Sequence, residues 1–181
     1  KLKIQNPIIS NEDLDKIKFI KHKDFKTFSV SALYKIKEGH NGIEKALERM
    51  VNKVSEKVDQ GYNIIIISDR GVNKKLAAIP ILLACSNIHH KLMKLKKRSK
   101  FGIVIESSEP REPHHFSMLF GYGASAINPY LVNEIIQHHH ISGAFPKQSL
   151  KSCIENYNKA IAKGILKVMN KIGISTLHSY R

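Results

Sequence analysis

A run of four consecutive isoleucines, residues 64–67, constrains the fold of this chain more than any other feature. It lies in an apolar segment over residues 62–68, and β-branched side chains favour extended backbone. A strand with one face in water alternates apolar and polar residues, whereas a continuous apolar run is typical of a strand covered on both faces. The run therefore predicts a strand of a parallel sheet.

Strand and helix patterns alternate along the rest of the chain. Further strands are predicted over residues 28–33, 101–107 and 124–127, each rich in apolar or alternating residues. Helices are predicted to begin at Ser10 or Asn11, Asn41, Pro80, Pro113, Pro129 and about Ser149. Crossovers of this kind are right-handed, so the pattern predicts an α/β fold of about four strand–helix units. The parallel sheet is half-barrel-like or open, and a long carboxy-terminal helix follows it.

Several helix ends carry specific signals. Asn41 and Glu44 have the spacing of a capping box, and the helix that they open is predicted to reach Gly61. Gly121 and Gly173 are the predicted stops of two later helices. Asn128 and Pro129 stand in a strand-to-helix loop, where Asn can cap a helix and Pro can begin it.

Size and composition limit the classes of protein. The 181 residues, 42% of them hydrophobic, suffice for one globular domain. The chain begins at Lys1 without methionine and ends directly after an apolar segment, so we expect a fragment of a longer protein. It has no signal peptide and no run of about 18 apolar residues, which predicts a soluble, cytoplasmic protein that does not enter a membrane. Cys85 and Cys153 alone cannot hold an iron–sulfur cluster or a four-cysteine zinc site, and they indicate a reducing compartment.

The chain is strongly basic, with 30 Lys and Arg, 15 Asp and Glu and a net charge of +15. Such a charge raises nucleic acid or an acidic protein as a partner. Lysine far outnumbers arginine, however, and Lys, Asn and Ile are all frequent, as an AT-biased coding sequence would produce. We favour this compositional explanation over a nucleic-acid partner.

Polar clusters follow two of the predicted strands, at the ends where α/β proteins place their ligands. Asp69 and Arg70 follow the isoleucine strand, and Glu106 and Arg111 follow the next one, ahead of two adjacent histidines. The clusters contain the groups of a general acid and base or of an anion site. The structural alternative is that the charged side chains hold the loops and that one histidine faces the core. We favour the structural alternative.

The histidines and glycines match no stronger motif. His89 with His90, and His138 to His140, invite a zinc hypothesis, but no pair has the i, i+4 spacing with a nearby Cys or Glu. No helix directly follows Gly121 and Gly123, so they are turn glycines rather than a dinucleotide fingerprint.

Four segments together resemble one family. They are ISDRG at 67–71, ESSEPREPHHF at 106–116, GYGASAINPYL at 121–131 and NYNKAIAKGILKVMNKIGISTLHSYR at 156–181. They resemble the central domain of the glutamate synthase large subunit and the start of its flavin domain, in order and over nearly the whole chain. NPIIS at 6–10 resembles the start of the same domain.

The resemblance implies a fragment of an oxidoreductase that forms L-glutamate from L-glutamine and 2-oxoglutarate. In that family a glutaminase domain releases ammonia, which reaches an FMN domain through a tunnel. The central domain, expected over 1–148, would connect the two and help to form the ammonia path, and 149–181 would lead into the FMN domain. The parent enzyme carries FMN and an iron–sulfur cluster and takes electrons from ferredoxin or a nicotinamide-dependent small subunit. We expect neither cofactor nor a catalytic residue in this chain, and the plastid stroma as its compartment if the source is an alga or plant.

The residues carried over from the family motifs are expected to serve architecture and interfaces. An independent small α/β enzyme or anion-binding domain, using Asp69, Glu106 and Arg111, is the alternative. The motif and interface candidates are Ser68, Asp69, Arg70, Gly71, Glu106, Glu109, Arg111, His114, His115, Gly121, Tyr122, Gly123, Pro129, Ser175, Ser179, Tyr180 and Arg181.

Overall fold

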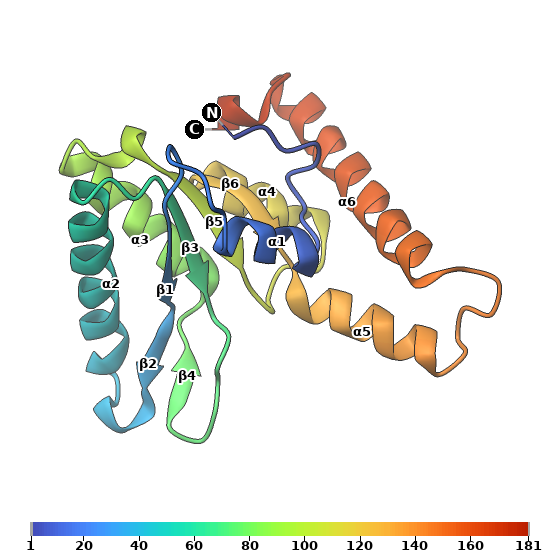
Figure 1. The fold of residues 1–181 in the computed structure, drawn as a ribbon, viewed down its shortest axis with the longest axis horizontal. Coiled ribbons are helices and arrows are strands. Elements are labelled where there is room, and N and C mark those ends of the chain that lie inside the picture. The colour runs from blue at the N-terminus through green and yellow to red at the C-terminus, as the bar shows by residue number, and fades with distance from the viewer. Residues whose placement is uncertain (1, 181) are drawn as a thin grey trace.

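A computed structural model describes residues 2–180 and has a parallel four-stranded sheet at its centre (Figure 1). The strands are β1 (Thr27–Ser31), β3 (Ile64–Ser68), β5 (Gly102–Glu106) and β6 (Ala124–Asn128). They lie side by side in the order in which the chain makes them. Each crossover therefore moves one strand in the same direction, as in half of a β/α barrel. The predicted α/β class and parallel sheet are confirmed.

The protein has two hydrophobic cores, one on each face of the parallel sheet. The crossovers are α2 (Asn41–Asp59), α3 (Ile81–Lys94) and α4 (Pro113–Gly121), and the last two lie behind the sheet in Figure 1. Ile65 and Ile67 point into this larger core, whereas Ile64 and Ile66 point into a smaller one on the opposite face. There α1 (Asn11–Lys18) lies in front of the sheet and contributes Leu14. The isoleucine run is thus covered on both faces, as predicted.

The chain start also closes one edge of the sheet. Ile8 forms a parallel bridge to Ile127 on the free side of β6. The Ile9 N–H donates to the Ile127 carbonyl at 2.9 Å, and the Ile127 N–H donates to the Pro7 carbonyl at 2.8 Å. An exposed strand edge is an open template for pairing, and this segment removes it.

A two-stranded ribbon was not predicted. Antiparallel strands β2 (Leu33–Lys35) and β4 (Leu76–Ala78) extend from the ends of β1 and β3. With three residues each, they are too short to show a periodic pattern in the sequence. Short 3-10 turns at η1 (Ile36–Glu38), η2 (Arg98–Lys100) and η3 (Leu177–Tyr180) likewise have no sequence signature.

The last two helices form an arm beside the sheet. They are α5 (Tyr130–Ile141) and α6 (Leu150–Ile172), and in Figure 1 both lie to the right of the sheet, α6 passing close to α4. At the contact with α4, Gly164 lies directly against the ring of Pro113, leaving no room for a Cβ. Ser149 caps α6 and Gly173, with φ of +75°, ends it, as predicted.

Two predicted helix ends are wrong. Asn41 is the first residue of α2 rather than its cap, and His40 at the cap position makes no side-chain bond. Asn128 does not cap α5, because its side chain is buried at the end of β6 and bonds elsewhere. Within residues 2–180, none of the helices is both long enough and apolar enough to cross a bilayer.

Candidate functional site

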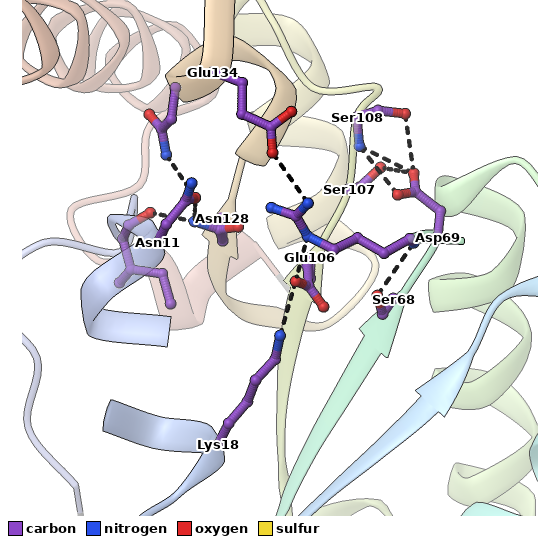
Figure 2. Close-up of polar contacts among 12 residues, drawn as sticks. Asn11, Lys18, Ser68, Asp69, Glu106, Ser107, Ser108, Asn128 and Glu134 are labelled. Atoms are coloured by element: carbon purple, nitrogen blue, oxygen red, sulfur yellow. Dashed lines mark hydrogen bonds and ion pairs between the residues drawn. The ribbon is translucent and has the colours of Figure 1, made fainter. Parts of the chain in front are cut away.

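The polar clusters behind β3 and β5 meet in space because the two strands are neighbours in register. Ser68 pairs with Glu106 in the ladder, so the residues that follow both strands emerge at the same edge of the sheet. Figure 2 shows the residues nearest the strand ends, Ser68, Asp69, Glu106, Ser107 and Ser108, with Lys18 of α1 and Glu134 of α5. The two clusters therefore lie side by side at the carboxyl ends of the strands.

Asp69 is fully buried and is surrounded by donors. Its carboxylate accepts the Ser107 hydroxyl at 2.6 Å and the Ser108 N–H at 3.0 Å, with the Ser108 hydroxyl at 3.3 Å (Figure 2). A buried carboxylate is tolerated when hydrogen bonds replace its lost hydration. These bonds tie the start of the β5–α4 loop to the end of β3.

Glu106 lies at the centre of an ion-pair network. Its Oε1 accepts from Lys18 Nζ and from Arg70 Nε, both at 2.8 Å (Figure 2). Burial alone would raise the pKa of Glu106, but hydrogen bonds from Lys18 and Ser68 and the charge of Lys18 outweigh it and lower the pKa. The side chain is 4% exposed, so it is a buried anion between two cations that reach the surface.

Arg70 carries the network to α5. Its NH1 donates to Glu134 Oε1 at 3.0 Å, and its guanidinium lies 3.8 Å from the centroid of the Tyr130 ring. Burial, followed by the negative charge of Asp69, raises the pKa of Tyr130 to about 12. Two nitrogens of the guanidinium, Nε and NH1, thus donate to carboxylates, and its flat face stacks on an aromatic ring.

An amide cluster beside the network was not predicted. The Asn128 side-chain amide donates to the Ile9 carbonyl at 3.0 Å and to Asn11 Oδ1 at 2.9 Å, and Asn133 donates to the same oxygen at 3.2 Å (Figure 2). These bonds fix the start of α1 to β6 and α5. The available signal was a polar residue directly after a buried strand, which we interpreted as a cap.

The β5–α4 loop contacts two further helices. The Glu109 carboxylate accepts the Ile81 N–H at 3.0 Å and so caps α3. Burial, and then the charge of Asp69, raise the pKa of Glu109 despite this bond. The Arg111 carbonyl accepts the Tyr157 hydroxyl of α6 at 3.1 Å. One loop therefore joins β3, α3 and α6.

The two histidines after this loop do not enter the core. His115 Nδ1 accepts the Arg111 N–H at 3.2 Å and completes a capping box with Glu112 at the start of α4. His114 and His115 are both exposed, so the expectation of one core-facing histidine is wrong. The buried histidine is His89, on α3.

The remaining motif residues lie away from the strand ends. Gly121 and Tyr122 end α4, and Gly123, with φ of +102°, packs against the His89 ring before β6 begins, at the opposite edge of the sheet. The remaining placements are Gly71 at φ +99° after Arg70, Pro129 at the cap position of α5, Ser175 and Ser179 exposed in the tail, and Tyr180 half-buried against the larger core. Arg181 lies outside the described residues.

Neither a metal centre nor a large cavity accompanies the network. In residues 2–180, no group of three or more His, Cys, Asp or Glu side chains is arranged to hold a metal ion. A pocket of about 340 Å³ lies beside the loop, between the first turns of α3 and α4, and Glu109 lines it with Met118 and Leu119. This arrangement favours a structural role, in which the side chains hold helices and strands together, over a catalytic role.

Comparisons with known proteins give a consistent result. Residues 1–181 match a family model described as the glutamate synthase central domain. The chain is 38% identical, over its full length, to the NADPH glutamate synthase large chain of Bacillus subtilis, and 37% identical to the NADH glutamate synthase of Schizosaccharomyces pombe. It is 30% identical, over 99% of its length, to the ferredoxin-dependent glutamate synthase of Pyropia yezoensis. It spans only 12%, 9% and 12% of these relatives, respectively.

A solved structure supports the fold. A mutant flavocytochrome b2 with benzoylformate matches with a TM-score of 0.58 at 11% identity, covering 94% of this chain and 36% of that one. At this identity the match concerns architecture alone.

Proposed function

This chain belongs to the glutamate synthase central-domain family, and from that membership we propose that it is the rigid connector between the glutaminase and FMN domains of a glutamate synthase. In this proposal the parent enzyme forms L-glutamate from L-glutamine and 2-oxoglutarate. The relatives' names, with NADPH, NADH and ferredoxin as donors, support an oxidoreductase without selecting its electron source. FMN and an iron–sulfur cluster would belong to other parts of the polypeptide.

The observation that carries the proposal is the set of bonds around the β5–α4 loop. Asp69 ties the loop to β3, Glu109 ties it to α3, and the Arg111 carbonyl ties it to α6. The neighbouring Glu106 network adds α1 and α5. Hydrogen bonds and ion pairs between these elements hold them at fixed distances, which a connector between two reaction centres requires.

We also propose how the chain divides and where ammonia passes. Residues 1–148 would form the connecting body, and 149–181 would lead into the FMN domain. Loops of the connecting body would form part of the wall of the ammonia path. The support for these finer statements is the family resemblance of the segments, together with the contact of α6 and η3 with α4.

The test is to loosen the loop in the full-length enzyme. In Asp69→Asn and Ser107→Ala variants, we expect glutamine-dependent glutamate formation to fall while glutaminase turnover continues, so that ammonia escapes to solvent. The measurement is the ratio of ammonia released to glutamate formed, with added ammonium as a bypass of the path. Ser142→Ala, at an exposed position just after α5, is the control for a serine substitution outside the loop.

Two results would contradict the proposal. One is an unchanged ratio in variants whose loop is measurably more mobile by hydrogen exchange. The other is stoichiometric FMN on the separately purified 181-residue chain, which would favour an independent enzyme. The pairing of Arg70 with Glu106 and Glu134 already gives little support to an anion site there.

A further inference from the structure

A groove opens at the amino-terminal edge of the sheet, opposite the Glu106 network. Its volume is about 1160 Å³. Ile64, Val104 and Ala126, which face the smaller core, form part of its lining. The groove therefore lies against the inner face of the half-barrel at the starts of the strands, where these residues are buried.

Large apolar side chains are exposed at this groove. Leu2, Ile4 and Met93 line it and are 43%, 36% and 50% exposed. Single exposed apolar residues are ordinary, but three at one concave surface indicate a surface that another part of a protein covers. Burying them would remove apolar area from water.

The rim of the groove is positively charged. Lys96 and Lys100 line it, are exposed, and form no ion pair with any residue in 2–180. Arg98 is engaged inside the protein, where it donates to the carbonyls of Phe101 and Gly123 at 2.7 Å. Asp24 is the single carboxylate among the described lining residues, so the rim complements an acidic surface.

Both ends of the described chain lie at the groove. Leu2, the first described residue, and His178, two residues before the last described one, both line it. The Bacillus subtilis relative is much longer, since this chain spans 12% of it. In a polypeptide of that length, the segments on either side would be tethered beside the groove, and tethering raises the effective concentration of a docking partner.

We infer that this groove is the docking surface for a neighbouring domain of the same polypeptide. That domain presents apolar side chains to Leu2, Ile4 and Met93 and carboxylates to Lys96 and Lys100. The inference rests on the proposed connecting function and deepens it, because it names the surface through which the connector holds its neighbour.

Lysine acetylation of the full-length enzyme tests the inference. The acetylation rate of each lysine in the folded enzyme is divided by its rate in urea-unfolded enzyme, so that differences in intrinsic reactivity between lysines cancel. We expect Lys96 and Lys100 to react several-fold more slowly than Lys53, an exposed lysine on α2. If Lys96 and Lys100 react fast while other exposed lysines react slowly, the inference that the groove is the docking surface is wrong, but the proposed connecting function is not contradicted. Equal rates at all exposed lysines would overturn both.

Photo-cross-linking identifies the occupant. A benzophenone amino acid replaces Met93 in the full-length enzyme, and the same amino acid at Lys53 is the control. We expect position 93 to cross-link to a peptide outside these 181 residues. When ¹⁴N-labelled and ¹⁵N-labelled enzyme are mixed, both peptides of each cross-link should carry the same isotope, because they come from one copy of the polypeptide. Cross-links to a second copy, or only within the 181 residues, would overturn the inference.

Charge reversal supplies a further check. Lys96→Glu with Lys100→Glu should lower the cross-link yield from position 93 several-fold, because the rim would repel carboxylates. Lys45→Glu with Lys53→Glu, a matched pair on α2, should leave the yield unchanged. An equal loss in both pairs would contradict a role for the rim charges.

Discussion

At the scale of the residue, Glu106 carries the most consequential contacts. It is a buried carboxylate between Lys18 and Arg70, which are 23% and 41% exposed. Removing one member of a fully buried ion pair costs about 3–5 kcal/mol. Removing the charge of Glu106 should cost less than this, because both cations reach solvent and Arg70 still pairs with Glu134.

We expect Glu106→Gln to lower the free energy of unfolding at neutral pH by about 1–2 kcal/mol. The pKa of Glu106 is lower in the folded than in the unfolded chain. The carboxylate therefore stabilises the fold above its ordinary pKa of 4.5, and this contribution is lost as the pH falls through the lowered folded-state pKa. Urea titrations along a pH series should show the wild-type advantage shrinking on acidification.

Glu134→Gln is the control for this prediction. Glu134 pairs with the same arginine, but its side chain is 45% exposed, so we expect a loss below about 1 kcal/mol. Equal effects of the two substitutions, or a Glu106 effect that does not change with pH, would contradict the assigned role of the buried carboxylate.

At the scale of the element, the contact between α4 and α6 depends on a glycine. Gly164 is in the interior of α6, where Gly→Ala ordinarily stabilises a helix by about 1 kcal/mol. Here a Cβ would overlap the Pro113 ring at the start of α4, and a proline ring on a helix cannot rotate away. Overpacking of this kind costs about 1–3 kcal/mol.

We therefore expect Gly164→Ala to destabilise the chain by about 1 kcal/mol, against helix propensity. Chemical denaturation measures the loss, and hydrogen exchange should show faster opening of α6. In a double-mutant cycle, Pro113→Gly, which removes both the Cβ and the Cγ that an added Cβ would meet, should relieve the overlap, so the alanine at 164 becomes neutral or favourable in that background. A stabilised Gly164→Ala variant would show that the two helices separate more easily than this contact implies.

At the scale of the whole molecule, the two sheet faces are covered unequally. The larger core takes residues from four helices, whereas the smaller one is covered by α1 and the segment before it. α1 enters that core through Leu14, which is 2% exposed, and Ile17, which is 7% exposed. The inner face should therefore open before the rest of the domain unfolds.

We expect Leu14→Ala to cost about 3 kcal/mol and to expose the inner face. Dye binding to apolar surface should then rise at urea concentrations below the main transition. Phe19→Ala, which removes a side chain that is 75% exposed just after α1, is the control and should change little. A single cooperative transition without dye binding would mean that the two cores do not separate.

Local patterns in the sequence were sufficient for the α-helices, the strands of the parallel sheet and the fold class. The isoleucine run predicted a doubly covered parallel strand, and Ser149 and Gly173 marked the ends of α6. Such signals are local, because side-chain periodicity and caps depend on residues within a few positions of one another. The short strands β2 and β4 were not predicted, because three residues are too few to show an alternating pattern.

The sequence by itself determined a parallel α/β chain whose polar residues follow its strands, and its motifs identified the family. Only the tertiary structure decided the partners: Arg70 with Glu106, 36 positions apart, and Asn128 with Asn11, 117 positions apart. It also decided that α1 covers the inner face and that a groove remains at the opposite edge. The reason is physical, since the pairing of distant groups depends on strand register and helix packing in three dimensions, which no local pattern of residues records.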